Sequence, residues 1–262
     1  MQDDIKTCAF CGQLLTSKTK SKEHVWAKWL QKRLDVEKLP FQGIHSGFPW
    51  GVHTISSRTQ STSSIVLGGV CANCNNGWMS ELEIKVAPIF EKLWDIGKDK
   101  YVILDSQSCE NLAQWAFKTS LVVNLASNYR RIVPSKHFRD FYEQRKFPEN
   151  SAIDIALAPF GNYLQWNQGQ SAIGTISSDI EVTKAMSKQI SSLYVITLDV
   201  AGILLRTMWV PTDFLEIPRP NEHNVKRIYP FTSEVKLLSN KRKSELGNFH
   251  VSARFRSSKR TL

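Results

Sequence analysis

The sequence predicts an α+β protein in two parts: a module of strands and a helix pinned by two cysteine pairs, then an α+β domain with a mainly antiparallel sheet. Both CxxC pairs lie within the first 84 residues. Two long stretches with helical apolar spacing follow, and from residue 152 the chain turns into short apolar runs separated by Gly, Asn and Pro. With 262 residues, 42% of them hydrophobic and 10% aromatic, the chain can bury a substantial core.

Four of the five cysteines have the spacing of zinc ligands: Cys8 and Cys11, then Cys71 and Cys74, with 59 residues between the pairs. A CxxC turn points both sulfurs at one ion, and two such turns complete the closed four-thiolate tetrahedron of a structural zinc site. Two buried, unliganded pairs are the alternative. A redox role fits less well, because no thioredoxin-like βαβ pattern surrounds either pair. The fifth cysteine, Cys109, opens a predicted helix and is expected to be a packing residue.

The first predicted domain, residues 1–100, combines the cysteine site with a trailing helix. Residues 42–64 are rich in Gly, Ser and Thr, which indicates loop or short strands, and "SIVLGGVC" indicates a strand that enters the second cysteine pair. The following stretch, "NNGWMSELEIKVAPIFEKLWDIG", has helical spacing, and Pro88 is expected to end or kink the helix near its midpoint. Glu81 and Glu83 are expected on the surface. The predicted apolar face consists of Trp78, Leu82, Val86, Ile89 and Leu93.

The second predicted domain, residues 101–235, should place helices on one side of its sheet. Helices are expected over residues 108–127, where Ser108 gives a start signal, and over residues 135–146. Strands are expected in "AIDIALAPF", "YLQWNQ", "AIGTISS" and "SLYVITLDVAGILLRTMWV". Its many aromatic residues suit a surface that binds or senses a partner protein or forms a homodimer, or else a large core, which is the favoured alternative.

The formal net charge of +10 is concentrated in a basic tail, residues 236–262, which holds 8 basic residues and 1 acidic residue. The tail suits a polyanion such as nucleic acid, and a solvated chain end is the equal alternative. No apolar run approaches the roughly 18–20 residues that span a bilayer, and "MQDDIKTCAF" has no secretory pattern. We therefore expect a cytoplasmic protein without a membrane partner, where paired cysteines are metal ligands more often than disulfides.

A closed zinc site performs no chemistry, so catalysis would need other side chains. Between the cysteine pairs, "SKEHVWAKWL" places Glu23 beside His24, and Asn75 follows the last zinc-type cysteine. A carboxylate and an amide carbonyl are hard oxygen ligands for a divalent cation, while a neutral imidazole can take a proton from water. Together these groups can activate water against a phosphodiester.

The segments "CAFCG", "EHVWAKW" and "VCANCNNGW" resemble the HNH endonucleases, the ββα-metal nucleases, over roughly residues 6–84. The resemblance implies a metal-dependent hydrolase of DNA, with RNA as an alternative substrate, and a role in bacterial restriction or anti-phage defence. It assigns His24 as the general base, and Glu23 and Asn75 as ligands of a catalytic Mg²⁺ or Mn²⁺. The four cysteines become the structural Zn²⁺ set.

The chain departs from the family pattern in lacking a counterpart of the middle Asn, which normally braces the catalytic His. His53, Thr54, Ser63 or Ser64 could take its place, and His53 could instead touch substrate. Asn75 could serve only as a helix cap, and Asn76 is its rival for either duty. The alternative function is therefore a catalytically lapsed, zinc-stabilised module that binds nucleic acid or protein.

Overall fold

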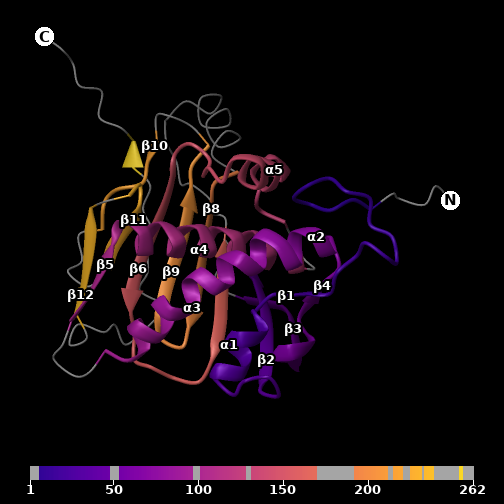
Figure 1. Ribbon diagram of the computed structural model, residues 1–262, viewed down its shortest axis with the longest axis horizontal. Coiled ribbons are helices and arrows are strands. Elements are labelled where there is room, and N and C mark those ends of the chain that lie inside the picture. Colours follow the sequence, from indigo (N-terminus) through magenta and orange to yellow (C-terminus); the bar gives the residue numbers. More distant parts are fainter. Residues whose placement is uncertain are drawn as a thin grey trace, which may run out of the picture.

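The computed structural model describes residues 6–47, 53–96, 101–127, 131–169, 192–211, 215–220, 225–231, 233–238 and 254–255. These residues form an α+β fold in which every strand pairing is antiparallel, as the sequence predicts. Helices α3 (Ser80–Trp94) and α4 (Ser106–Ala126) lie in front of the main sheet in Figure 1, and the N-terminal strands lie near one end of α3.

The N-terminal region is built on a short antiparallel pair, β1 (Glu23–His24) and β4 (Val66–Leu67). Helix α2 (Ala72–Cys74) follows β4 closely and continues through the π-helical turn η2 (Asn75–Met79) into α3. Strand β4 therefore leads into the helix, with the second cysteine pair at the junction between them.

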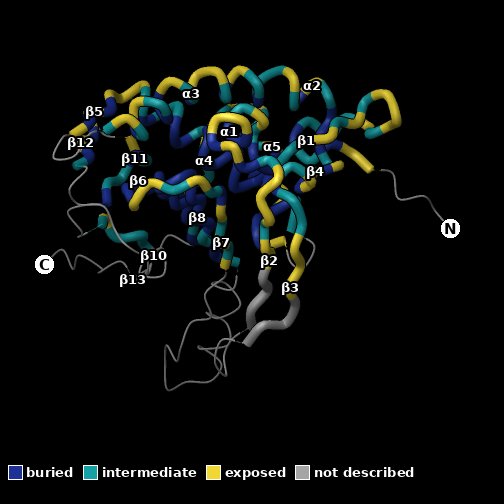
Figure 2. Tube along the Cα trace, turned by 90° about the horizontal axis from the view of Figure 1, so that it is seen from below, coloured by how far each residue is buried: buried dark blue, intermediate teal, exposed yellow. Residues whose placement is uncertain are grey.

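Between β1 and β4 the chain forms helix α1 (Lys28–Arg33), a long hairpin of β2 (Pro40–Gly47) and β3 (His53–Ser61), and the 3₁₀ turn η1 (Thr62–Ser64). The strands of this hairpin are longer than the loop or short strands that the sequence predicts. Their Ser- and Thr-rich stretches show no regular apolar alternation, which is the signal by which a half-buried strand is recognised. Figure 2 shows the hairpin projecting from the body of the protein.

The long helices agree with the predicted apolar stripes, but Pro88 does not interrupt α3. The helix continues past Pro88 to Trp94. Proline removes one backbone hydrogen bond, here to the carbonyl of Ile84. Since Ile84 is 71% exposed, water can satisfy that carbonyl. The residues of α3 that are buried are Leu82, Val86, Ile89, Phe90 and Leu93.

Helix α4 begins slightly earlier than predicted because Asp105 caps it, its Oδ1 accepting a hydrogen bond from the Ser108 amide at 2.7 Å. Helix α5 (Ser135–Gln144) matches the second predicted helix and ends at Arg145, which adopts the left-handed conformation. As predicted, Cys109 is a packing residue, fully buried in the first turns of α4.

The main sheet has five strands in the order β11-β6-β9-β8-β7. The predicted run "SLYVITLDVAGILLRTMWV" forms its central hairpin, and "AIDIALAPF" and "YLQWNQ" supply β6 and β7. The run "AIGTISS" lies outside the described residues. Helices α3 and α4 lie on one side of the sheet (Figure 2). The strands are β6 (Ser151–Leu157), β7 (Leu164–Gly169), β8 (Tyr194–Val200), β9 (Ile203–Trp209) and β11 (Val225–Tyr229).

Two further strand pairs complete the fold: β5 (Tyr101–Asp105) with β12 (Glu234–Leu238), and β10 (Leu215–Glu216) with β13 (Arg254–Phe255). Strand β12 crosses the boundary at residue 235 that the sequence suggests for the second domain. The main cluster of buried apolar side chains draws on both predicted domains, from Cys8 to Leu237. The domain boundaries themselves stay a prediction.

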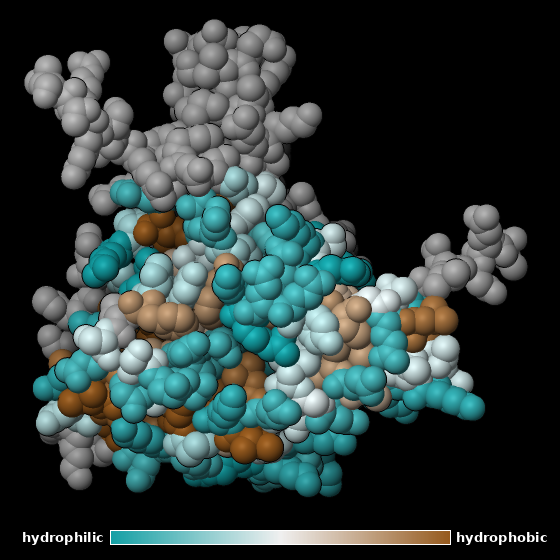
Figure 3. All heavy atoms as spheres, turned by 45° about the horizontal axis from the view of Figure 1, so that its top comes forward, coloured by the Kyte–Doolittle hydropathy of each residue, from teal (hydrophilic) through white to brown (hydrophobic). Residues whose placement is uncertain are grey.

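The face of the protein shown in Figure 3 is mostly polar, with hydrophilic residues interspersed with separate apolar patches. No helix in the described part of the chain is both long enough and apolar enough to cross a bilayer.

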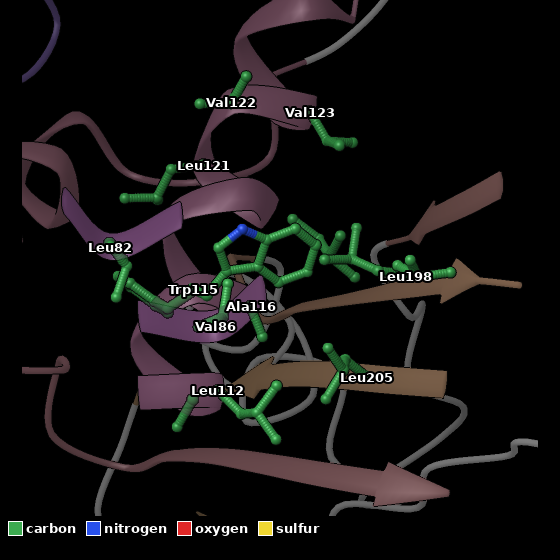
Figure 4. Packing of buried hydrophobic residues seen from close by; sticks show 14 of the residues in the cluster. Leu82, Val86, Leu112, Trp115, Ala116, Leu121, Val122, Val123, Leu198 and Leu205 are labelled. Carbon is green, nitrogen blue, oxygen red and sulfur yellow. The ribbon is translucent and has the colours of Figure 1, made fainter. Parts of the chain in front are cut away.

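Trp115 of α4 is expected to be the most costly single truncation in the shared core. Its ring lies among Leu82 and Val86 of α3 and Leu198 and Leu205 of the sheet (Figure 4), and it is 1% exposed. We expect Trp115→Ala to lower the free energy of unfolding by about 3–5 kcal/mol, since it removes a large buried ring and leaves a cavity.

Chemical denaturation monitored by circular dichroism would measure this change. Ile84→Ala on the exposed face of α3 is the control and should stay within about 0.5 kcal/mol of the unchanged protein. Equal losses for the two variants would contradict the central place of Trp115 in the core.

Candidate metal centre and the Glu23–His24 site

The four predicted zinc ligands converge on one point. The sulfur atoms of Cys8, Cys11, Cys71 and Cys74 all lie within 4.8 Å of one another. Two of the separations are 3.5 Å, between Cys11 and Cys71, and 3.9 Å, between Cys8 and Cys74. A tetrahedral site with Zn–S bonds of about 2.3 Å requires S···S edges of about 3.8 Å. The cluster therefore fits a tetrathiolate metal site such as zinc.

Hydrogen bonds from backbone amides also stabilise negative charge on two of these sulfurs. The amide of Cys71 donates to Cys8 Sγ and the amide of Cys74 donates to Cys71 Sγ, both at 3.4 Å. The hydrogen bond with Cys74 holds the pKa of Cys8 far below its usual value, at about 4, while the same bond and burial raise the pKa of Cys74. In the absence of a metal the group of thiols thus carries charge unequally, and a bound cation would stabilise all four as thiolates.

The second cysteine pair is held beside the segment that contains Glu23 and His24. The two residues pair with Leu67 and Val66, and the chain on either side continues the ladder. Ser21 N donates to Val70 O at 3.0 Å, and Ala72 N donates to Thr19 O at 2.8 Å. The β1–β4 pairing therefore fixes His24 relative to the start of helix α2.

His24 is half-buried, on the opposite side of the strand from Glu23. Burial and the charge of Lys28 lower the pKa of His24. The backbone of Ser63 acts in the opposite direction, but the net shift of the pKa is downward. Ser63 is brought close because its own amide donates to Glu37 O at 3.2 Å, which anchors turn η1. The Nδ1 atom of His24 is buried without a hydrogen-bond partner of standard geometry among the described residues. The imidazole is therefore neutral near pH 7.

Glu23 faces inward and is 8% exposed. Its charged neighbours are Lys118 of α4 and Glu83 of α3. These two form a buried ion pair with Nζ and Oε1 2.5 Å apart, and Trp29 Nε1 donates to the other oxygen of Glu83 at 2.7 Å. Glu83 is therefore not the surface residue that the sequence predicts, because the ammonium of buried Lys118 requires a partner. Glu81 is exposed, as predicted.

Burial raises the pKa of Glu23 to about 7, since the attraction of Lys118 is too weak to offset desolvation and the repulsion of Glu83. When a carboxyl has a higher pKa in the folded protein than in the unfolded chain, the free energy of unfolding falls as pH rises between the two pKa values. With no divalent cation added, Glu23→Gln should leave stability near pH 4.5 unchanged. It should raise stability at pH 8 by an amount on the order of 3 kcal/mol.

Urea denaturation of both proteins between pH 4.5 and 8 tests this expectation. Only the difference between the two proteins matters, because other titrating groups such as Asp199, whose pKa is raised by burial to about 6, are common to both. A difference that does not change with pH would contradict the protonation of Glu23.

Asn75 and Asn76 occupy the junction between α2 and η2. Asn75 is half-buried and Asn76 is exposed. The N-cap of α2 is Cys71, whose sulfur accepts from the Cys74 amide, and Asn75 is its C-cap, so Asn75 does not have the N-cap role that the sequence suggests. Within the described residues the Asn75 side chain has no hydrogen bond to Glu23 or His24. The backbone leaves helical geometry at Gly77, with φ −91° and ψ −115°, which separates this turn from α3. The half-buried side chain of Asn75 is therefore available to a ligand.

The auxiliary candidates are placed only in part. The backbone of His53 begins strand β3, opposite Gly47. Its side chain and that of Thr54 lie outside the described residues. Ser63 is one of the residues proposed to brace His24, and its backbone lies close to the His24 ring. The burial of Glu23 against α4 was missed, because no local pattern in the sequence indicates which helix covers an isolated carboxylate.

Comparison with protein-family models, with curated proteins and with solved structures gave no match to this chain. Functional assignment therefore depends on the residues described above.

Proposed function

We propose that the chain is a metal-dependent endonuclease of the HNH type that hydrolyses phosphodiester bonds in DNA. One observation carries the proposal: the strand that holds His24 pairs with the strand that leads into the four-cysteine centre and Asn75. The three segments of the motif are thus adjacent although they are far apart in sequence. Restriction or anti-phage defence is the role that the resemblance suggests.

His24 is the proposed general base. Its lowered pKa keeps the ring neutral at pH 7, so a ring nitrogen can accept the proton of an attacking water. The backbone of Ser63 is the group that would orient the ring in place of the family's middle Asn. This use of a backbone atom would explain how the site can function without an Asn between Asp35 and Ala72.

Glu23 and Asn75 are the proposed ligands of the catalytic cation, and their carboxylate and amide oxygens have the chemistry that Mg²⁺ or Mn²⁺ prefers. When bound, such an ion would stabilise charge on the scissile phosphate and the leaving oxygen. A cation would also compensate for the burial of Glu23, which otherwise favours the protonated acid.

A lapsed binding module is the second candidate. It is favoured by the position of Glu23, which lies on the opposite side of β1 from His24. The charged neighbours of Glu23 are Lys118 and Glu83, and it has no hydrogen bond to Asn75 among the described residues. Incubation of the full chain with supercoiled plasmid and Mg²⁺ or Mn²⁺ separates the two candidates. Nicked or linear products with 5′-phosphate ends are expected. Binding without any cleavage of DNA or RNA across these metals would favour the module instead.

A row of basic side chains beside His24 is expected to contact the phosphate backbone. Lys20, Lys22 and His24 alternate on one side of the extended segment, and both lysines are exposed. Lys28, at the start of α1, is close enough to lower the pKa of His24. Each phosphate contact adds about 0.9 to the slope of log affinity against log salt concentration.

Lys22→Gln and Lys28→Gln should therefore each reduce that slope by about 0.9 and weaken binding to duplex DNA. Fluorescence anisotropy with labelled DNA in the His24→Ala background measures binding without cleavage. Lys85→Gln, on an exposed position of α3, is the matched control. Equal slopes for all three variants would contradict this placement of the nucleic acid.

A further inference from the structure

Helix α5, which belongs to the second predicted domain, packs directly on the four-cysteine centre. Phe10, between the first two cysteines, contacts Phe138 with ring centroids 5.5 Å apart. Trp78, which follows the second pair, contacts Phe141 at 6.0 Å and Tyr142 at 6.3 Å. Each cysteine pair thus has an aromatic neighbour that is covered by α5.

Arg145, just after α5, is fixed next to the second cysteine pair. Its guanidinium carbon lies 4.1 Å from the centre of the Trp78 ring. Its Nη1 donates to the carbonyls of Phe141, at 3.2 Å, and of Tyr142. Burial lowers the pKa of Arg145, while Tyr142, Cys74 and Glu81 raise it. The guanidinium is therefore within electrostatic reach of a thiol ligand.

Arg139, an exposed residue of α5, reaches the turn that follows the first pair. A Cβ atom added to Gly12, next to Cys11, would be 2.9 Å from Arg139 Nη2. Gly12 has a φ of +75°, which favours glycine, and its missing side chain leaves room for the guanidinium. Arg139 on α5 and Arg145 just after it thus lie beside residues that follow the first and the second cysteine pair.

The charges of these groups are complementary. Four thiolates and one divalent cation carry a net charge of about −2, which is costly to bury without compensation. Arg139 and Arg145 together carry +2. Glu81, also near Arg145, is exposed and is thus a weaker competitor for it than the buried sulfurs.

We propose that α5 is the outer shell of the metal centre: Arg139 and Arg145 balance the charge of the metal–thiolate cluster, so metal binding attaches the N-terminal region to the second region. The two arginines are positioning residues and do not contact the metal. This role goes beyond the proposed nuclease activity and would hold for a protein that cuts no nucleic acid.

The test is the affinity of the full chain for Zn²⁺, measured by competition with a chromogenic chelator. Loss of an outer-shell partner typically weakens metal binding by about 10- to 100-fold. Arg145→Gln should fall in that range, and Arg139→Gln, which removes an exposed charge, should cause a smaller loss. Arg145→Lys, which retains the charge, should recover most of the affinity. Lys136→Gln is the control, since Lys136 lies on α5 with its side chain 81% exposed.

Wild-type affinity in both Gln variants would overturn the proposal. It would also be overturned if Arg145→Lys lost as much affinity as Arg145→Gln, because packing of the planar group would then be the cause. A second measurement does not depend on variants. Hydrogen exchange of the α5 amides should become faster when Zn²⁺ is removed, and unchanged protection would show that metal binding and α5 docking are not coupled.

Discussion

Replacing His24 with alanine is expected to reduce DNA cleavage by about 10²- to 10⁴-fold, the range associated with loss of a general base. The neutral imidazole is the one group beside the β1–β4 pair, among the described residues, that combines a lowered pKa with a ring nitrogen lacking a standard hydrogen bond. Without it, water would have to lose its proton to bulk solvent. Cleavage of supercoiled plasmid at pH 7.5 with Mn²⁺ measures the change.

The matched control is Val66→Ala. Val66 pairs directly with His24 across the strands and is 45% exposed, so its truncation perturbs the same short ladder without removing an acid–base group. We expect this variant to cleave at nearly the normal rate. Partial rescue of His24→Ala by added imidazole would support proton transfer as the lost function. Undiminished cleavage by His24→Ala would refute the assignment, even if the chain proved to be a nuclease.

Local patterns in the sequence were sufficient for the strongly apolar elements. The stripe of Leu82, Val86, Ile89 and Leu93 predicts α3, and the apolar runs in residues 192–210, separated at Gly202, predict the β8–β9 hairpin, whose strands are buried almost throughout. The cysteine cluster could also be predicted, because CxxC spacing is a local feature and two such pairs are typical of a four-thiolate metal site.

Long-range packing could not be predicted in this way. Nothing near Glu23 in the sequence indicates that it will be buried close to Lys118, or that Glu83 will pair with that lysine. Likewise, the pairing of β5 with β12 joins Tyr101 to Leu238, and no local signal specifies such a partner. These contacts depend on which surfaces remain to be covered once the individual elements have formed.

The same distinction applies to the site. The sequence correctly indicates the four cysteines that converge, whereas the environments of His24, Glu23 and Asn75, for which it predicts a base and metal ligands, depend on the tertiary fold. The raised pKa of Glu23, at about 7, is a consequence of its cover by α3 and α4. In the proposed enzyme this cover would make cation binding release a proton from Glu23 near neutral pH, so apparent affinity for Mg²⁺ should rise as pH increases through 7.

Cys71→Ser is expected to remove the structural metal and to have the largest effect on stability. Its sulfur accepts the Cys74 amide and lies 3.5 Å from Cys11, so it is both a ligand and the cap of α2. Metal binding to such sites contributes about 10–16 kcal/mol in small zinc domains, and losses above about 5 kcal/mol are expected when a ligand is removed. Metal content should fall from about one Zn²⁺ per chain to near zero.

Cys109→Ala separates this effect from the loss of any buried thiol. Cys109 is as deeply buried as Cys71 but lies outside the four-cysteine cluster, so this variant should keep its zinc and lose roughly 1 kcal/mol of stability. Hydrogen exchange then shows which elements lose protection in Cys71→Ser. If residues 1–100 form a domain, Cys71→Ser should expose the amides around β1 and β4 while strands β6, β8 and β9 remain protected. An affinity for Zn²⁺ in Cys71→Ser equal to that of the unchanged protein would contradict the tetrathiolate site, because a water or serine oxygen in the fourth position is a weaker zinc ligand than a thiolate.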